Sequence, residues 1–328
     1  MISITCVIPV YNVENYILDC LSSISRQTYK GTVECLLIDD CGSDNSIKIA
    51  QDFIGCYQGP FSFKIIKHEF NKGLSGARNT GLMNASCEYV YFLDSDDKIA
   101  DDCFELLSKP LSTDLYDIVV GGFDVEPKQK YHTYLNVDDS TVLYRNDILK
   151  QYGSFNIYMM AWNKLCRKSF LLNGECFFYE GILHEDELWS FNIVACAKSM
   201  YVVNRPTYIY SIREGSIMTS SKQQKRIDDM TIVCHEVVKI AKKNNILHNY
   251  YVNRCIQNIL SKPIKLCSDK STAKKLYSDL LSEVGLPRYQ CLIANGLKIG
   301  SQIRDFHWLL PYAIGFRLYC KLNRLKFD

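Results

Sequence analysis

Three aspartates stand together where an apolar segment ends. Residues 89–93 are apolar or aromatic and predict a strand, and Asp94, Asp96 and Asp97 follow within four positions. Carboxylates this close repel one another unless a cation lies among them. A hard divalent ion such as Mg²⁺ or Mn²⁺ takes oxygen ligands and can hold a diphosphate on its open side. The cluster therefore predicts a cation and phosphate site, with a solvated acidic turn that caps a helix near Asp101 as the alternative.

A second acidic group begins a predicted helix. Glu185 and Asp186 directly precede residues 188–194, whose apolar spacing is helical, so Asp186 falls in the first turn. A helix N-terminus stabilises an ionised carboxylate, which is the form that a general base needs. The alternative is that these acids only complement the helix dipole.

The elements that must position these groups alternate along the N-terminal half. Strands are predicted over residues 4–10, 34–38, 63–68 and 89–93, and helices over residues 14–27, from about 47, and after the glycine-bearing segment 71–79. This alternation predicts an α/β fold with a doubly wound, mostly parallel sheet. Ligands bind beyond the carboxyl ends of the strands in such sheets. Pro9, Asp40, Asn71 and Asp94 are expected to emerge at that edge.

Five motifs carry a resemblance to a known family. The stretches VIPVYN, LLIDDCGSDNS, NKGLSGARNTGL, YVYFLDSDD and HEDELW resemble, in order, motifs of the family 2 glycosyltransferases, over residues 1 to about 215. The resemblance implies a GT-A-type nucleotide-sugar-binding domain and inverting transfer from a UDP-sugar, with Mn²⁺ or Mg²⁺ as the cofactor. Cys87 stands where members of this family usually have a glycine.

The resemblance places the sugar donor at the strand ends. Asp40 is expected to accept the N3–H of uracil, where cytosine offers only a lone pair; thymine shares the uracil edge, so dTDP fits as well. The alternative is that Asp39 and Asp40 cap the helix that begins near residue 43. Asp96 is implied as the direct metal ligand, with Asp94 towards the ribose or a metal-bound water. The expected donor-binding residues are Pro9, Tyr11, Asp40, Lys72, Arg78, Asp94, Ser95 and Arg213.

Two of these donor residues have alternatives, and the acceptor side rests on three residues. Lys72 and Arg78 are candidates for phosphate contacts, or else a solvated lysine and a structural arginine. The resemblance marks Asp186 as the base that deprotonates the acceptor hydroxyl, with Glu185 holding a neighbouring group or an acceptor hydroxyl. Trp162 is either a platform for an acceptor sugar or a core residue.

Two residues outside these motifs, Arg213 and His68, are interpreted as follows. Arg213 follows a strand predicted from residue 208, and loop closure would carry its charge over the diphosphate. His68 shows no pattern of partner residues and is interpreted as an ordinary residue.

Composition favours a cytoplasmic enzyme. The 328 residues are 47% hydrophobic with a formal charge of +2, which gives no indication of nucleic-acid binding. The 15 cysteines are scattered without a CxxC pair, so reduced core thiols are expected rather than zinc ligands or disulfides. No charged leader with an apolar segment and no run of about 18 apolar residues is present, so neither secretion by that route nor membrane spanning is expected.

The chain changes character after about residue 215. Residues 1–215 are expected to form the catalytic domain, and residues 216–328 a small helical region. Its tail, residues 288–328, has seven Lys or Arg against two Asp, a net charge of +5, around the apolar segment 308–316. Such a segment suits an anionic membrane surface, and the alternative is a terminal helix packed on its own domain.

Together these observations predict an inverting, metal-dependent hexosyl- or N-acetylhexosaminyltransferase. It would move a sugar from a UDP-sugar to a hydroxyl of a lipid-linked glycan acceptor, peripheral at the inner face of the cell membrane, in synthesis of a bacterial capsule, O-antigen or exopolysaccharide. Two alternatives stay open. One is a non-catalytic nucleotide-sugar-binding subunit. The other is a sugar-phosphate nucleotidyltransferase, whose glycine-rich, basic N-terminal phosphate loop is absent.

Overall fold

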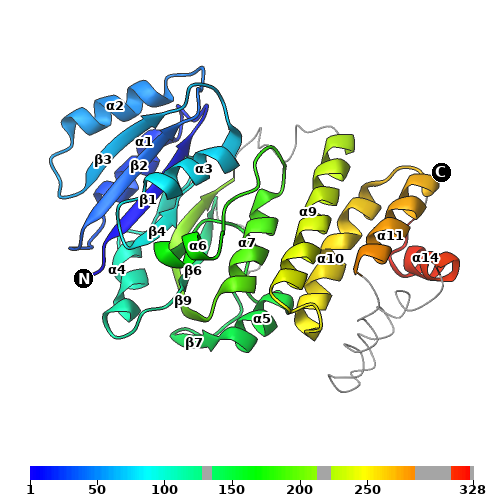
Figure 1. Cartoon of the computed structure of the whole chain (residues 1–328). Helices are drawn as coiled ribbons and strands as arrows, with labels where there is room; N and C mark the ends of the chain where they lie inside the picture. The colour runs from blue at the N-terminus through cyan, green and yellow to red at the C-terminus, as the bar shows by residue number, and fades with distance from the viewer. Residues whose placement is uncertain (128–134, 213–222, 285–311, 326–328) are drawn as a thin grey trace. The chain divides into compact units, whose positions relative to one another are not determined.

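The chain forms two compact units. The computed structural model describes residues 1–127, 135–212, 223–284 and 312–325. One unit consists of residues 1–151 and 155–214, and the other of residues 152–154 and 215–328 (Figure 1).

The first unit is built on a sheet of nine described strands. One half is parallel, and its strands lie in the order β3 (Ser62–Lys67), β2 (Val33–Asp39), β1 (Ile4–Val10) and β4 (Tyr89–Phe92). β1 and β4 are buried along their whole length. Short apolar runs suit strands that helices cover on both faces.

The other half of the sheet is mixed. It contains β5 (Lys98–Ile99), β6 (Ile118–Glu126), β7 (Thr141–Tyr144), β8 (Lys164–Arg167) and β9 (Ser199–Ser211). β8 runs antiparallel to β4 and β6, whereas β9 runs parallel to β6 and antiparallel to β5 and β7. Parallel strands lead into antiparallel ones at β8, so the α/β class is confirmed with a mixed second half.

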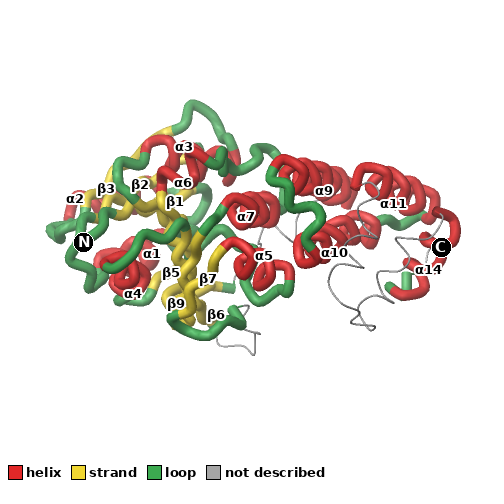
Figure 2. Tube along the Cα trace, turned by 60° about the horizontal axis from the view of Figure 1, so that its bottom comes forward, coloured by secondary structure: helices red, strands yellow, loops and turns green. Residues whose placement is uncertain are grey.

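Helices cover both faces of this sheet. α1 (Ile17–Ser25) and α4 (Cys103–Ser108) lie on one face, and α3 (Gly73–Asn84) and α6 (Lys168–Asn173) on the opposite face (Figure 2). α2 (Ser46–Cys56) packs beside α1. The unit also contains α7 (Glu185–Cys196), a 3₁₀ helix (Lys109–Ser112) and most of α5 (Arg145–Gly153).

The N-terminal end of one helix differs from the sequence prediction, and that of the next agrees with it. The helix predicted from residue 14 begins at Ile17, because the preceding residues form a turn in which Val13 O accepts the N–H of Tyr16. The next helix begins at Ser46, and Asp44 Oδ1 accepts both the N–H and the hydroxyl of that residue.

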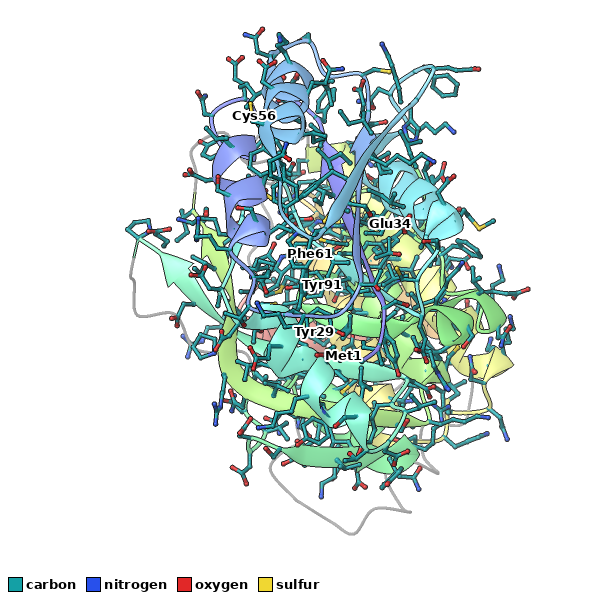
Figure 3. The ribbon with its side chains drawn as sticks, turned by 90° about the vertical axis from the view of Figure 1, so that its left-hand side faces the viewer. Met1, Tyr29, Glu34, Cys56, Phe61 and Tyr91 are labelled. Atoms are coloured by element: carbon teal, nitrogen blue, oxygen red, sulfur yellow. The ribbon has the colours of Figure 1, made fainter. Side chains whose placement is uncertain are left out.

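A buried polar network joins strands from both halves of the sheet. Tyr91 lies among the packed side chains of the interior (Figure 3), and its hydroxyl donates to Asn163 Oδ1 over 3.0 Å. The same oxygen accepts the Thr207 hydroxyl at 2.8 Å, and Asn163 Nδ2 donates to Gly122 O at 2.7 Å. Asn163 has a φ of 58°, a conformation that asparagine tolerates better than most residues. The network fixes β4, β6 and β9 around the residue that precedes β8.

The second unit is helical where it is described. It contains α9 (Gln223–Lys243), α10 (Tyr250–Leu266), α11 (Lys270–Val284) and α14 (Tyr312–Leu322). Asn249 caps α10, because its Oδ1 accepts the N–H groups of Tyr251 and Val252. Within the described ranges, every helix is too short or too polar to cross a bilayer.

The described part of the C-terminal tail packs within this unit. Phe316 and Tyr319 of α14 are buried, and both rings contact Tyr277 of α11 with centroids 5.4 Å apart. The Tyr319 hydroxyl donates to Ser261 O at 3.2 Å. This packing agrees with the alternative of a terminal helix on its own domain, whereas residues 288–311 lie outside the described residues.

Candidate active site

The parallel strands bring the predicted residues to one edge of the sheet. Val10 and Asp39 are paired in register at the ends of β1 and β2, and the N–H of Asp40 donates to Val10 O at 3.1 Å. The N–H of Leu93, just past β4, donates to Val7 O at 3.0 Å. Asp40 and the carboxylates after Leu93 therefore emerge at the same edge, as predicted.

Asp40 is held by the segment that follows β3. The residue is 3% exposed, and its Oδ1 contacts His68 Nδ1 at 2.7 Å and accepts the N–H of Lys72 at 2.7 Å. Asn71 Nδ2 donates to the carbonyl of Asp40 at 3.0 Å. At the start of α2 the N–H of Ser46 donates to Asp44, whereas the Asp40 carboxylate bonds to His68 and Lys72, so Asp40 has a different structural task from the predicted alternative. Sequence reasoning missed His68, because its partner lies 28 positions earlier in the chain.

The other predicted residues of this edge differ in exposure. Pro9 is buried within β1, opposite Ile38 of β2. Tyr11, the first residue past β1, is 50% exposed, so its ring is open to a ligand. The Lys72 side chain is exposed, with its ammonium 5.9 Å from the centre of the Phe70 ring.

The aspartate cluster after β4 forms a tight turn. Asp94 and Asp96 are half-buried, whereas Ser95 and Asp97 are buried. The Asp97 carboxylate accepts the Tyr208 hydroxyl at 2.6 Å and the N–H of Ser211 at 2.7 Å. Burial, followed by the negative charges of Asp96 and Asp94, raises the pKa of Asp97 well above its usual value. The turn therefore resists a further negative charge on Asp97.

The cluster fits a divalent cation in charge and in ligand type. Among the described residues, no three His, Cys, Asp or Glu side chains are placed to hold a metal by themselves. Mg²⁺ commonly binds one or two carboxylates and completes its coordination with water and substrate phosphates. Asp94 and Asp96 supply carboxylates of this kind, and a cation there would offset the repulsion that adds to burial in raising the pKa of Asp97.

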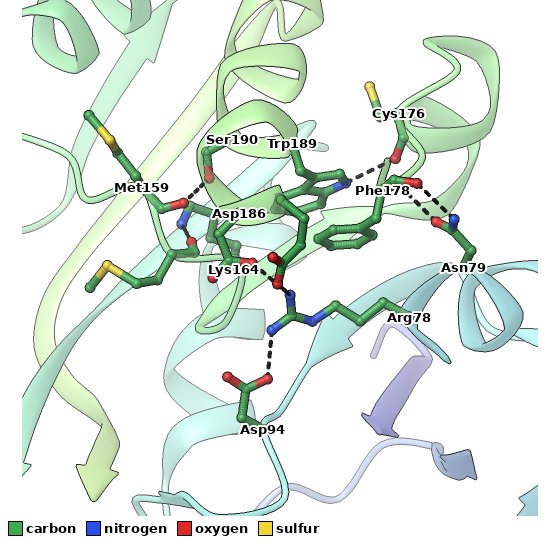
Figure 4. A network of polar contacts seen from close by, with 12 residues as sticks. Arg78, Asn79, Asp94, Met159, Lys164, Cys176, Phe178, Asp186, Trp189 and Ser190 are labelled. Carbon is green, nitrogen blue, oxygen red and sulfur yellow. Dashed lines mark hydrogen bonds and ion pairs between the residues drawn. The ribbon is translucent and has the colours of Figure 1, made fainter. Parts of the chain in front are cut away.

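Arg78 joins this cluster to the second acidic group (Figure 4). The guanidinium is fully buried, and its Nη2 donates to Asp94 Oδ1 at 2.8 Å. Its Nη1 donates to Asp186 Oδ1 at 2.6 Å and to Glu185 Oε1 at 3.2 Å. Burial alone would lower the pKa of Arg78, but the three carboxylates raise it above its usual value. Asp94 thus shares one cation with two acids that lie 91 and 92 positions further along the chain.

Glu185 and Asp186 lie in the first turn of α7, as predicted. His184 precedes them with a φ of 64°, a left-handed conformation that turns the chain into the helix. Burial, and then the negative charge of Asp186, raises the pKa of Glu185 to about 7, with Arg78 acting in the opposite direction. The Asp186 side chain keeps 28% of its surface exposed, and it accepts the bond from Arg78 through Oδ1.

Lys164 is a buried cation near these acids that sequence reasoning did not single out. Its ammonium donates to Met160 O and lies 4.0 Å from the centre of the Tyr158 ring. Burial lowers the pKa of Lys164 to about 7, although the charge of Asp186 acts in the opposite direction. Figure 4 shows the side chains of Lys164 and Asp186 close together. The only sequence signal was its place in the segment AWNKL.

Trp162 is packed inside the protein. It is 3% exposed and stacks on Tyr208 with ring centroids 4.3 Å apart and an interplanar angle of 5°. A ring covered to this extent has little surface for an acceptor sugar, so the packing favours the core interpretation. Arg213 lies outside the described residues.

Comparison with known proteins gives the same family as the motifs. The sequence model described as glycosyl transferase family 2 matches residues 5–172, just over half of the chain. Glycosyltransferase GlyA of Streptococcus pneumoniae is 35% identical over 223 residues, which are 65% of this chain and 31% of GlyA. Poly(ribitol-phosphate) beta-N-acetylglucosaminyltransferase TarS of Staphylococcus aureus is 27% identical over 225 residues, or 67% of this chain and 38% of TarS.

A solved structure confirms the fold. The crystal structure of S. aureus TarS residues 1–349 in complex with UDP-GlcNAc superposes with a TM-score of 0.76 at 20% identity, covering 99% of this chain and 91% of that one. This likeness confirms the predicted GT-A-type fold. From the matched family model and the ordered motifs, we conclude that the chain belongs to glycosyl transferase family 2.

Proposed function

We propose that this protein is an inverting glycosyltransferase that uses a UDP-sugar donor and a glycan acceptor. The observation that carries the proposal is the ion-pair network of Arg78, which holds the donor-side Asp94 and the acceptor-side Asp186 in one site. A transferase needs a base beside the reacting sugar, and this network places a candidate base next to the carboxylates of the proposed diphosphate site.

The chemistry assigned to the chain is a single displacement. Asp186 takes the proton of the acceptor hydroxyl as that oxygen forms a bond to the anomeric carbon of the donor sugar. The bond between this carbon and the diphosphate oxygen breaks on the opposite face, and UDP leaves with the electron pair. One in-line displacement inverts the configuration of the anomeric carbon. Arg78 orients Asp186 through Oδ1, which leaves Oδ2 for the acceptor.

Metal and nucleotide would be bound at the sheet edge. Asp96, together with Asp94, would hold Mn²⁺ or Mg²⁺, which supplies positive charge for the diphosphate when it is bound. Asp40 would accept the N3–H of uracil, and the exposed Tyr11 would contact the base. The UDP-GlcNAc bound to the TarS fragment supports a UDP-sugar, with an N-acetylhexosamine as the first donor to test.

The acceptor and the location are proposed from the relatives and the tail. The name of TarS describes transfer of N-acetylglucosamine to poly(ribitol-phosphate), which supports a polymeric glycan acceptor, and we place this chain in bacterial surface polysaccharide synthesis. A lipid-linked acceptor at the inner face of the membrane agrees with the +5 charge of residues 288–328. Arg317, Lys321 and Arg324 are exposed, so their charges can face an anionic surface.

Release of UDP tests this function. The full chain is incubated with UDP-GlcNAc, UDP-glucose or UDP-galactose, an acceptor glycolipid extract and Mn²⁺, and UDP is measured over time. We expect release from at least one donor, with loss of release in EDTA and in Asp96→Asn, which removes an anionic ligand without changing volume. A chain that binds UDP but releases none would instead be a binding subunit. If EDTA leaves the release of UDP unchanged, the proposed dependence on a divalent metal is wrong.

A further inference from the structure

We propose that His68 is a positioning residue that sets which nucleobase the donor site accepts. The proposal rests on the proposed function, in which Asp40 binds the base of the donor. It concerns how the carboxylate of Asp40 is turned, because only one of its two oxygens can face the base.

One oxygen of Asp40 is already occupied by two donors. His68 Nδ1 lies 2.7 Å from Oδ1, and the N–H of Lys72 donates to the same atom at 2.7 Å. The side chains of His68 and Asp40 are each 4% exposed, so water scarcely competes with these bonds. No described residue donates to Oδ2, and since this atom is not both buried and without a partner, it keeps some surface open to a ligand. Oδ2 is therefore the oxygen left for a ligand.

His68 is itself fixed on three sides. Its Nε2 lies 2.8 Å from the hydroxyl of Thr80 on α3, and its backbone N–H donates to Asp39 O at 2.9 Å. The Cys41 thiol donates to the carbonyl of His68 at 3.2 Å. A hydroxyl that donates to Nε2 leaves the ring proton on Nδ1, facing the carboxylate. The imidazole is thus oriented as a donor towards Asp40.

The backbone of Lys72 makes this arrangement asymmetric. A peptide N–H can only donate, so whichever residue stands at position 40 must present an oxygen to it. With aspartate, the second oxygen is an acceptor and selects a base with an imide N–H, as in uracil or thymine. With asparagine, the amide oxygen is required at the occupied position, and the NH₂ group must face the base. That group would donate to N3 of cytosine and would meet the N3–H of uracil as a clash of donors.

The test compares the binding of UDP and CDP to the full chain by calorimetry in the presence of Mn²⁺. The variants are Asp40→Asn, His68→Asn and His68→Gln, with thermal melting as a control for folding. The asparagine amide at position 68 can replace Nδ1, whereas the longer glutamine places its amide near Nε2 and leaves Asp40 without that donor. Tyr201→Phe, in β9, serves as a control substitution.

We expect the parent to prefer UDP over CDP by about tenfold or more, the usual worth of a hydrogen bond to a charged group. Asp40→Asn should reverse the preference, and a gain of CDP binding cannot arise from unfolding. His68→Gln should reduce the preference for UDP, and His68→Asn should retain it.

Three results would count against the proposal. A parent that binds neither nucleotide would overturn the proposed function and this assignment with it. A parent that selects UDP, together with an Asp40→Asn variant that weakens both nucleotides equally, would overturn the assignment alone. An unchanged ratio of UDP to CDP affinity in His68→Gln would also overturn it.

Discussion

At the scale of single residues, the site is organised by one buried guanidinium. Arg78 contacts Asp94, Glu185 and Asp186, so it offsets the repulsion among acids that the fold brings together. Removing one member of a buried ion pair leaves an uncompensated charge and is strongly destabilising. The sequence motif predicted a phosphate contact or a structural arginine for this residue. Its burial and ion pairs agree with the structural interpretation, and a phosphate contact stays a prediction.

The stability of the protein should depend on pH through Glu185. Its pKa is raised to about 7, above the ordinary 4.5, so the folded state binds its proton more readily than the unfolded state does. Its contribution to stability is complete below the unfolded pKa and is lost as the pH rises through about 7. Glu185→Gln should remove up to about 3 kcal/mol of this loss in the free energy of unfolding.

The measurement is urea unfolding of both proteins at several pH values, followed by circular dichroism. Lys164, whose pKa is lowered to about 7, acts in the opposite direction, so the difference between parent and variant is the quantity to compare. Glu69→Gln, at an exposed residue, is the matched control. Parent and Glu185→Gln curves that stay parallel across this range would show that Glu185 is not the group that titrates.

Among the elements, strand β9 supports the turn of Asp94 to Asp97 through Tyr208. Tyr208 donates its hydroxyl to Asp97 at 2.6 Å and accepts the N–H of Asp94 at 3.4 Å. Its ring stacks on Trp162, which packs edge to face against Phe123 with centroids 4.9 Å apart. Trp162, predicted as an acceptor platform or a core residue, therefore packs against β9, and β9 in turn bonds to the turn of Asp94 and Asp97.

Tyr208→Phe tests this support. Loss of the hydroxyl leaves the buried Asp97 carboxyl without one of its two bonds, which should cost about 1–3 kcal/mol in the free energy of unfolding. Affinity for UDP with Mn²⁺ should also fall, because the turn that carries Asp96 loses an anchor. Tyr201→Phe on the same strand, whose ring contacts Tyr116, is the control. Equal UDP affinity in all three proteins would argue against a role for β9 in the site.

The same elements show what the sequence could predict. β1, β2 and β4 were predicted within about two residues, because buried parallel strands are short apolar runs bounded by turn residues. Their order placed Asp40 and Asp94 at one edge through a general rule of parallel sheets. The partners of His68, Arg78 and Tyr208 were not predictable, because each contact joins segments whose approach depends on tertiary packing.

At the scale of the whole molecule, the chain combines a GT-A-type sheet unit with a helical unit. The proposed donor and acceptor residues that are described all lie in the first unit. The tail belongs to the second, where Phe316 and Tyr319 are buried. Truncation would therefore remove core residues, so exposed charges are the better probe of membrane binding.

Neutralising the tail should weaken membrane association. Arg317, Lys321 and Arg324 are exposed, and their replacement by glutamine should reduce sedimentation with anionic liposomes, because each charge adds about 1 kcal/mol near such a surface. UDP affinity should not change. The control replaces three exposed lysines of the first unit, at positions 30, 48 and 64, and so matches the change in net charge. If both triple variants sediment like the parent, the membrane proposal is wrong.

Asp186 is proposed as the base of a transfer from a UDP-sugar, and the Asp186→Asn variant separates this role from a structural one. Asparagine keeps the size of the side chain and cannot take the proton of the acceptor. Transfer to acceptor should fall by about two to four orders of magnitude, while calorimetry gives a UDP affinity close to that of the parent. If Asp186→Asn transfers sugar at nearly the parental rate, the acid serves only the dipole of α7 and the account of catalysis is contradicted.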